Sequence, residues 1–440
     1  MASARDVRVL GISETCDLGS MYLRLLCEGH DVRVTVSEPL AAGTMAGLVP
    51  KAEDWRAELE WVREAGCDGL ILFEAVGFGS LQDELRRQGF NVIGGSALGD
   101  RLEDDRAFAL DLLRRGGLRA PAVREFESAA EAIADLAERP RRCVYKASAS
   151  AGDTFVGSFP DGSDIAALLA ARKQSGGRFI LMDHVEGVET GAGAYFDGEK
   201  FLRPACVDWE HKRFFAGDMG ELTGEMGTIA TFDSSETIFA ATLEPLEPLL
   251  REAGHVGYVN LNTIINADGI WPLEFTCRFG YPGFAVLEPL QAIGWAELFQ
   301  AMIGGDGTSF DMHGGFCACI VLTTPPFPYS RHEVEAPVGL PVLVEDVPPE
   351  HLHLGEVGMS GGQLVTSGLY GWTAVVTGTG ATVAEAKAAA YVNASAVRAP
   401  NVRYRLDIGD KLISGDLEKL RGWGWLKSTP PSRIASQIVR

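Results

Sequence analysis

Short apolar runs alternate with amphipathic segments over the first 98 residues, a pattern typical of a parallel sheet covered by helices. Strands are predicted at 7–10, 31–34, 69–73 and 91–93, and helices at 18–28, 53–65 and 80–88. This alternation favours a doubly wound α/β domain over residues 1–98. Ligands bind such sheets beyond the carboxyl ends of the strands, so the loops at 11–21 and 74–80 are expected to border a pocket.

The pattern changes after residue 98 and predicts a mixture of α/β and α+β units. One amphipathic helix is expected over 101–116, inside a connecting segment at 99–120. A compact α+β unit follows at 121–185, and a larger unit with long strands at 186–305. A glycine-rich stretch at 304–315 precedes a small, strand-rich α+β domain at 316–440.

A late hairpin combines apolar strands with polar side chains. Residues 257–280 are predicted to form two apolar strands joined by the turn Asn266–Gly269, and the second strand ends in Glu274, Thr276 and Arg278. Alternation at period two places Glu274, Thr276 and Arg278 on one face. Oxygen ligands suit Mg²⁺, and a guanidinium suits a transferring phosphoryl group. An ordinary surface strand explains the same alternation, so the interpretation depends on other motifs.

Two motifs in the 121–185 unit and just after it are compatible with a nucleotide. Lys146 ends a strand and precedes a small-residue loop containing Ser150, through which backbone N–H groups can approach phosphate. A strand ending near Met182 is followed by a hinge, in which Asp183 and Val185 can offer backbone hydrogen bonds to an adenine edge. Glu189 can then accept from ribose hydroxyls. A solvated lysine and a surface acid are the alternatives.

Three basic side chains are candidates for anion contacts. Lys212 and Arg213 lie in the mixed-charge segment Asp208–Arg213, which precedes the glycine-bounded loop Thr223–Thr228, and they are candidates to hold a substrate carboxylate. Arg106 on the connecting helix could face a phosphate. Exposed, solvated charge explains each of them equally well.

Composition excludes several classes of function. The formal net charge of −21 opposes binding to nucleic acid and to anionic membranes. No apolar run approaches the roughly 20 residues of a membrane span. The N-terminus lacks a basic-then-apolar signal segment, and the eight cysteines form no Cys-x-x-Cys pair, so reduced thiols in a cytoplasmic protein are expected. Small molecules are therefore the expected partners of a monomer or homodimer.

Together these motifs resemble the ATP-grasp superfamily and, within it, the phosphoribosylamine–glycine ligase (glycinamide ribonucleotide synthetase) family. The most specific block, Leu273–Gly280, is similar to that family's Ile-Glu-Phe-Asn-Cys-Arg-Phe-Gly. Thr223–Gly227 (Thr-Gly-Glu-Met-Gly) resembles its Thr-Gly-Gly-Met-Gly. Further similar blocks are Leu102–Phe108, Val144–Ala147, Asp183–Glu189, Glu210–Arg213, Leu364–Gly368 and Tyr404–Gly409.

The resemblance implies an ATP-grasp fold with an N-terminal doubly wound domain, a lid at 121–185, a catalytic unit at 186–305 and a small C-terminal domain. It implies ATP with Mg²⁺ or Mn²⁺ as cofactors and an acyl-phosphate route from a carboxylate, such as an amino acid, and an amine to an amide. Arg106 would replace an ATP-contacting lysine, residues 183–185 would hold adenine, and Glu189 would hold ribose. Glu274 would bind the metal, with Thr276 at the family's asparagine and Asn262 as a further oxygen donor.

The departures from the family motifs concentrate at the amine side. The first loop, Gly11–Ser20, has no basic residue and carries Glu14 and Asp17, where the family has Gly-Ser-Gly-Gly-Arg-Glu-His. A phosphate there would meet like charge. We therefore expect a ligase of the same chemistry acting on a different amine. An authentic phosphoribosylamine–glycine ligase and a nucleotide-binding protein without ligase activity are the alternatives, the latter motivated by Thr276, Arg106 and a missing loop lysine near Asp153.

Overall fold

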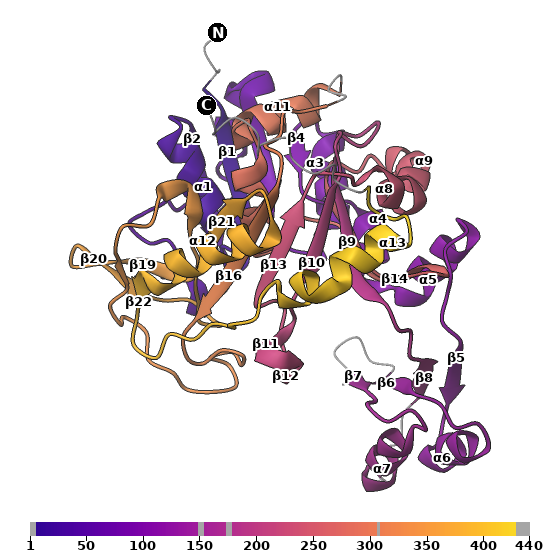
Figure 1. The fold of residues 1–440 in the computed structure, drawn as a ribbon. Helices are drawn as coiled ribbons and strands as arrows, with labels where there is room; N and C mark the ends of the chain where they lie inside the picture. The colour runs from indigo at the N-terminus through magenta and orange to yellow at the C-terminus, as the bar shows by residue number, and fades with distance from the viewer. Residues whose placement is uncertain (1–5, 148–153, 173–177, 306–308, 428–440) are drawn as a thin grey trace, which may run out of the picture.

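The computed structural model describes residues 6–147, 154–172, 178–305 and 309–427, and the fold combines three main sheets with surrounding helices (Figure 1). Ser150 and Asp153, which the sequence analysis places in the phosphate loop, lie outside the described residues.

The N-terminal part forms the expected parallel sheet, in the strand order β2–β1–β3–β4. Its elements are β1 (Arg8–Ser13), α1 (Gly19–Cys27), β2 (Asp31–Val36), α2 (Leu59–Glu64), β3 (Gly69–Phe73), α3 (Gly79–Arg87) and β4 (Asn91–Ile93). Helix α2 is shorter than the predicted helix at 53–65. The carboxylate of Asp54 accepts a hydrogen bond from the backbone N–H of Arg56 at 3.0 Å, which stabilises a turn in place of the first helical turns.

The connecting segment contains two helices, so the prediction of one helix over 101–116 is wrong. They are α4 (Ala97–Asp104) and α5 (Arg106–Arg115). Asp105 between them has non-helical dihedral angles, and its carboxylate accepts from the backbone N–H of Phe108 at 3.0 Å. Asp105 is therefore the N-cap of α5. The break places Arg106 at the first position of α5, beside the central sheet.

Residues 121–185 build a small antiparallel sheet, here called the lid unit, that projects from the body (Figure 1). Its strands follow the order β5–β8–β6–β7 and are accompanied by two helices. The elements are β5 (Val123–Phe126), α6 (Ala129–Glu138), β6 (Cys143–Ala147), β7 (Thr154–Val156), α7 (Ser163–Ala171) and β8 (Phe179–Asp183). Leu136, Cys143, Ile165 and Leu181 belong to a core of its own. Lys146 therefore lies near the end of β6, on a unit joined to the body by two short connections.

The body is built on an eight-stranded sheet in the order β15–β14–β9–β10–β13–β16–β21–β18. The strands are β9 (Val188–Phe196), β10 (Cys206–Glu210), β13 (Gly227–Thr231), β14 (Gly257–Asn266), β15 (Gly269–Thr276), β16 (Phe316–Thr323), β18 (Leu352–Leu354) and β21 (Trp372–Gly380). The glycine-rich boundary predicted near 304–315 does not interrupt this sheet, because β16 pairs antiparallel with β13, from Gly227↔Ile320 to Ala230↔Cys317. The apolar residues of β16 are almost all buried, because the strand lies inside the central sheet.

Helices and three two-stranded sheets complete the described fold. The helices are α8 (Glu236–Thr242), α9 (Glu247–Glu252), α10 (Gly283–Leu287), α11 (Trp295–Gly304), α12 (Val383–Ser395) and α13 (Leu417–Gly422). The paired strands are β11 (Arg213–Phe215) with β12 (Met219–Leu222), β17 (Leu343–Val344) with β22 (Val397–Arg398), and β19 (Val357–Ser360) with β20 (Gln363–Thr366). None of the described helices is long and apolar enough to cross a membrane.

The junction between the N-terminal sheet and the central sheet depends on a close backbone approach. The N–H of Gly94 donates to the carbonyl of Val256 at 2.9 Å. A Cβ on Gly257 would lie 2.1 Å from the carbonyl oxygen of Gly94, a clash that no side-chain rotation can relieve. We expect Gly257→Ala to destabilise the protein by about 1–3 kcal/mol. Thermal unfolding checks this, with Gly422→Ala as the control because a Cβ at Gly422 has open space around it. Equal melting temperatures for the two variants would contradict the prediction.

Candidate active site

The β14–β15 hairpin carries its polar side chains into a cavity of about 380 Å³. Asn262 pairs with Glu274, and Asn260 with Thr276, across the hairpin. A register shift after Asn262 marks a bulge in the ladder. Glu274, Thr276 and Arg278 all line the cavity, although β15 ends at Thr276. The alternation read from the sequence thus brings Glu274 and Thr276 to the cavity from β15, and Arg278 lines the cavity from beyond the end of the strand.

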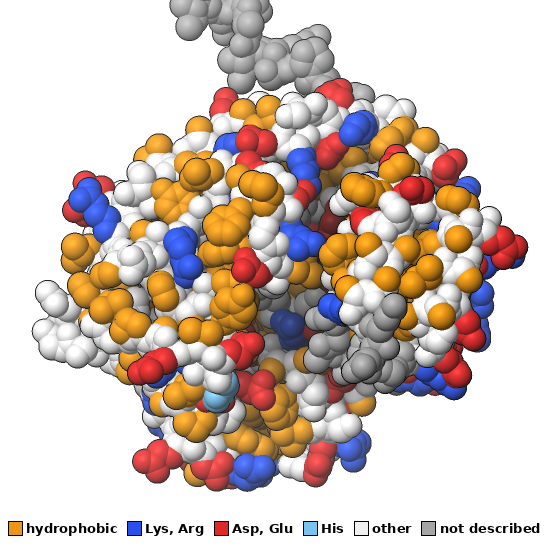
Figure 2. All heavy atoms as spheres, turned by 90° about the horizontal axis from the view of Figure 1, so that it is seen from below, with side chains coloured by type: hydrophobic (Ala, Val, Ile, Leu, Met, Phe, Trp, Pro, Cys, Tyr) orange, Lys and Arg blue, Asp and Glu red, His pale blue; other side chains and the backbone are white. Residues whose placement is uncertain are grey.

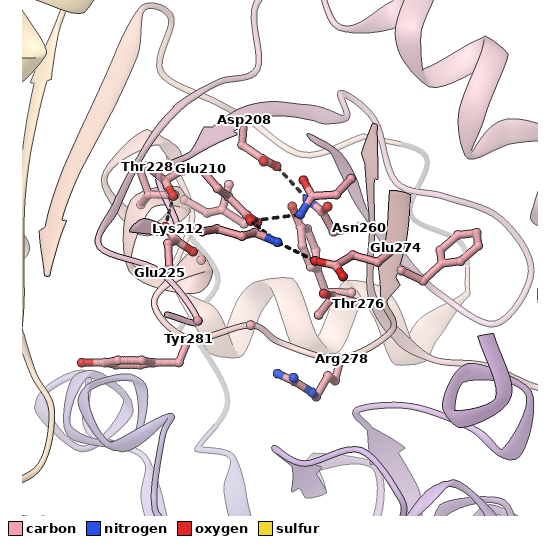
Figure 3. A pocket seen from close by; sticks show the side chains of 18 of the residues that line it. Asp208, Glu210, Lys212, Glu225, Thr228, Asn260, Glu274, Thr276, Arg278 and Tyr281 are labelled. Carbon is pink, nitrogen blue, oxygen red and sulfur yellow. Dashed lines mark hydrogen bonds and ion pairs between the residues drawn. The ribbon is translucent and has the colours of Figure 1, made fainter. Parts of the chain in front are cut away.

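Lys212 joins two carboxylates on that wall (Figure 3). Its Nζ lies 2.5 Å from Oε1 of Glu274 and 3.3 Å from Oε2 of Glu210. Asn262 donates from Nδ2 to the same Glu210 oxygen at 2.9 Å. Burial disfavours the ammonium, but Glu210 and Glu274 outweigh it and raise the pKa of Lys212. Lys212 is therefore a permanent, positioned positive charge.

Three cations surround Glu274. Arg106 donates from NH2 to the carbonyl of Leu273 at 2.9 Å, and Glu274 favours its charge. Burial, followed by the charges of Arg106 and Lys212, lowers the pKa of Lys146 to about 8, although Glu274 acts in the opposite direction. Burial opposes ionisation of Glu274 itself, but Lys212, Arg106 and Lys146 hold its pKa below the ordinary value. Arg106, Lys146 and Lys212 thus provide three positive charges beside Glu274 and Glu210, and a polyanion can pair with these cations. Seen from below, the molecule is hollowed, with Lys and Arg side chains in and around the hollow (Figure 2).

A second cavity, of about 340 Å³, lies at the hinge between the lid unit and β9. Val185 and Glu189 line it together with Trp209 and Ile264, and Glu210 lines both this hinge cavity and the larger one. Burial raises the pKa of Glu189, Lys212 lowers it, and Glu210 and Glu274 raise it further. A ligand with a flat apolar group in the hinge cavity could therefore extend past Glu210 towards Lys212 and Glu274 in the larger cavity.

The structure places two of the predicted residues differently. Asp183 accepts from Nε of Arg141 at 2.8 Å, so its carboxylate is engaged inside the lid unit and its side chain does not line the hinge cavity. Arg213 lines neither cavity. Its NH1 donates to the carbonyl of Gly220 at 2.9 Å, within the β11–β12 hairpin. Hairpin geometry turns this side chain away from Lys212.

Arg278 occupies a separate part of the cavity wall, directed away from the Lys212–Glu274 pair (Figure 3). Its NH2 lies 3.1 Å from Oε1 of Glu103, and the other Glu103 oxygen accepts from the N–H of Cys277 at 3.0 Å. Its Nε has no hydrogen-bond partner among the described residues. Asp17 lines the cavity as well; burial raises its pKa, while Thr15 and Arg278 lower it.

Several site residues were missed by the sequence analysis. Trp372 of β21 stacks on Tyr281 with ring centroids 4.7 Å apart, and both line the large cavity. Lys411 and Leu412, from the C-terminal part, line the hinge cavity. No local pattern marks these residues, because tertiary pairing alone brings them to the site. Glu225, by contrast, was visible as the one acidic residue inside an otherwise family-like glycine motif.

Comparison with known proteins identifies proteins similar to this chain. Residues 104–284 match the model of the phosphoribosylglycinamide synthetase ATP-grasp (A) domain. A phosphoribosylamine–glycine ligase of Nostoc sp. strain PCC 7120 is 29% identical over 350 residues, covering 76% of this chain and 81% of the relative. One from Brucella melitensis is 26% identical over 376 residues, covering 82% and 87%.

Solved structures show the same fold. The phosphoribosylamine–glycine ligase of Thermotoga maritima aligns with a TM-score of 0.68 at 21% identity, covering 91% of this chain and 100% of that one. A Campylobacter jejuni biotin carboxylase in complex with β,γ-ATP aligns with a TM-score of 0.61 at 11% identity, covering 90% and 93%. At these identities the structural likeness concerns the fold alone.

The matched domain and the fold define an ATP-dependent ligase of the ATP-grasp superfamily, as the sequence motifs predict. Within that superfamily the chain is similar to the phosphoribosylamine–glycine ligases, with 26–29% identity over 76–82% of its length in the two relatives above.

Proposed function

We propose that the protein joins a carboxylate to an amine through an acyl phosphate formed from ATP. The carboxylate oxygen attacks the γ-phosphorus and ADP leaves. The amine nitrogen then attacks the acyl carbon, and inorganic phosphate leaves as the amide forms. The observation that carries this proposal is the convergence of Arg106, Lys146 and Lys212 on Glu274; Lys212 and Glu274 line the larger cavity, and Glu210 beside them lines both cavities. Fixed charges at the site of phosphoryl transfer supply most of such catalysis.

The two cavities suggest how the nucleotide would lie. Adenine fits the hinge cavity beside Val185, where backbone groups of 183–185 can read its edge, and Glu189 is available for ribose hydroxyls. The phosphates would then extend towards Lys146, Arg106 and Lys212. Arg278, at the other side of the larger cavity, is suited to a substrate carboxylate, because its guanidinium retains one N–H without a partner in the described structure.

The residues present fit a divalent cation that is shared with phosphates. No cluster of three His, Cys, Asp or Glu able to hold a metal exists among the described residues. Mg²⁺ in nucleotide sites usually needs only one or two protein oxygens, because water and phosphate complete its octahedron. Glu274 would provide a carboxylate, Asn262 an amide oxygen and Thr276 a hydroxyl, all on the same cavity wall. When bound, the cation would neutralise charge on the phosphates.

The amine is proposed to lack a phosphate group. Asp17 lines the larger cavity from the first loop, and Glu74 lies behind it, accepting from Ser13 at 2.7 Å and Tyr22 at 2.6 Å. Burial and Asp17 raise the pKa of Glu74 to about 7, against three hydrogen bonds that lower it. A phosphorylated amine at this loop would meet negative charge, without a basic residue from the loop to compensate. Phosphoribosylamine remains the second candidate, because the relatives are phosphoribosylamine–glycine ligases.

ADP release tests the proposal. We expect ADP and an amide product, identified by mass spectrometry, with one or more pairs from a panel of amino acids and non-phosphorylated amines. Efficient turnover of glycine with phosphoribosylamine, and of no other pair, would support the second candidate. ATP binding in calorimetry without turnover of any pair would instead identify a nucleotide-binding protein and overturn both ligase proposals.

A further inference from the structure

One wall of the larger cavity is formed by three acidic residues, Asp208, Glu210 and Glu225. We call it the acidic wall. Figure 3 shows Asp208 on one side and Glu225 on the other side of the Glu210–Lys212 pair. The complete cavity lining contains six carboxylates and two cations, the carboxylates being Asp17, Glu103, Asp208, Glu210, Glu225 and Glu274, and the cations Lys212 and Arg278.

The carboxylates of the acidic wall are deeply buried and only partly paired. Asp208 is 5% exposed; its Oδ2 accepts from Asn260 at 2.6 Å, while its Oδ1 has no hydrogen-bond partner among the described residues. Glu225 is 6% exposed, and one of its oxygens accepts from the hydroxyl of Thr228. A buried carboxylate oxygen without a partner is costly, and a bound ligand is one way of satisfying it.

The existing cation does not neutralise the acidic wall. Lys212 is already shared between Glu210 and Glu274. Arg278 is paired with Glu103 at the other side of the cavity. Glu225 adds a third carboxylate to the wall, and its hydrogen bond from the hydroxyl of Thr228 supplies no positive charge.

The position of the Asp208 carboxylate requires a glycine on the neighbouring strand. A Cβ on Gly191 of the neighbouring strand β9 would lie 2.1 Å from Oδ1 of Asp208. Gly191 pairs with Asp208 across β9 and β10, so the carboxylate lies over the backbone of its neighbour. This packing leaves the carboxylate little freedom to move out of the cavity wall.

We propose that the acidic wall binds a positively charged group of the substrate, an alkylammonium carried in addition to the group that reacts, as in a diamine or a basic amino acid. This inference rests on the proposed function, because it treats the cavity as the substrate cavity. Tyr258, Val286 and Leu287 line the same cavity and offer apolar surface to a short alkyl stem. An ammonium has three N–H donors, so it can pair with more than one carboxylate.

The raised pKa values of the acidic wall make cation binding dependent on pH. Burial and Glu210 raise the pKa of Asp208 to about 8, against Asn260 and Lys212. Burial, Glu210 and Asp208 raise the pKa of Glu225, and Lys212 lowers it. Tyr258 and Cys206 also face Asp208, both with raised pKa values and so neutral. A bound cation would favour the ionised carboxylates, so binding releases protons and strengthens as pH rises towards about 8.

Calorimetry with 1,4-diaminobutane and 1-aminobutane tests this inference directly, without turnover. We expect the diamine to bind the full-length wild-type protein roughly tenfold or more tightly than the monoamine. Glu225→Gln should remove about that preference, and Glu252→Gln, an exposed acid on α9, should leave it unchanged. Repeating the titration in buffers of different ionisation enthalpy measures the proton release.

The outcomes separate this inference from the proposed function. Equal affinity for the two amines, or an unchanged preference in a folded Glu225→Gln protein, overturns the acidic-wall inference even if amide formation is found with other amines. Glu225-dependent diamine binding without ADP release from any pair upholds the cation site and overturns the ligase proposal. If Glu225→Gln unfolds, Glu225→Asp, which keeps the charge but shortens the side chain, must weaken diamine binding, and unchanged affinity overturns the inference.

Discussion

Glu274→Gln is expected to lower kcat for ADP release roughly 100- to 1000-fold. Glutamine keeps the size of the side chain and one carbonyl oxygen, so the cavity shape is preserved. It removes the negative charge that faces Lys212, Arg106 and Lys146. Lys212, now paired with Glu210 alone, would be drawn away from its shared position between the two carboxylates. The variant also loses the one charged oxygen ligand offered to a phosphate-bound cation by the β14–β15 hairpin.

Steady-state ADP release with the amino acid–amine pair that turns over measures this effect. Glu252→Gln is the matched control, since it makes the same chemical change at an exposed position of α9. Thermal unfolding of each variant establishes that both are folded. A Glu274→Gln enzyme with kcat within a factor of about three of wild type would remove the central support for the phosphoryl-transfer site.

Local sequence patterns predicted the parts of the site that single strands create. The β-period of the 270–276 strand placed Glu274 and Thr276 on the cavity wall, and Arg278 just beyond the strand lines the same cavity. The strand end at Lys146 and the hinge before Glu189 could be read similarly, because strand ends and hinges have short-range signals in apolar runs and small residues. The N-terminal parallel sheet followed from the alternation of strands and helices.

Long-range pairing explains what could not be predicted. Trp372 reaches Tyr281 only because β21 joins the central sheet through β16. The sequence analysis did not predict this pairing, because the glycine-rich stretch near 304–315 was interpreted as a domain boundary. The break between α4 and α5 depends on one N-cap residue, Asp105. The helical periodicity of the sequence continues through this position, so the break could not be predicted from it. Arg213 follows Lys212 directly in the sequence, yet the β11–β12 hairpin directs its side chain to the carbonyl of Gly220.

Charge states follow from the same tertiary arrangement. Sequence shows four separate residues, Arg106, Lys146, Lys212 and Glu274, each of which is commonplace on a protein surface. Their mutual effects arise only when α5, the lid unit, the segment after β10 and β15 meet. The lowered pKa of Lys146 is therefore a property of the fold, and we expect it to make nucleotide affinity dependent on pH.

ATP affinity is expected to fall as pH rises through about 8 because Lys146 loses its proton there in the protein without nucleotide. Burial, Arg106 and Lys212 disfavour the charged form, while Glu274 favours it, and the balance lowers the pKa. Triphosphate adds negative charge beside Lys146, so the bound form should retain the proton. Binding then takes up one proton above the pKa, and Kd should rise roughly tenfold per pH unit, up to the affinity of the neutral-lysine protein.

Calorimetric titration of ATP with Mg²⁺ over about pH 7 to 9.5 measures this slope, and the variants assign it to Lys146. Lys146→Arg keeps its charge over the whole range, so its Kd should change little with pH. Lys146→Met should bind weakly at every pH, with an equally flat profile. The same two substitutions at Lys200, in the turn after β9, should preserve the wild-type slope. A slope that persists in Lys146→Met would have to come from another group, and Lys146 would then not be the phosphate ligand whose proton the nucleotide retains.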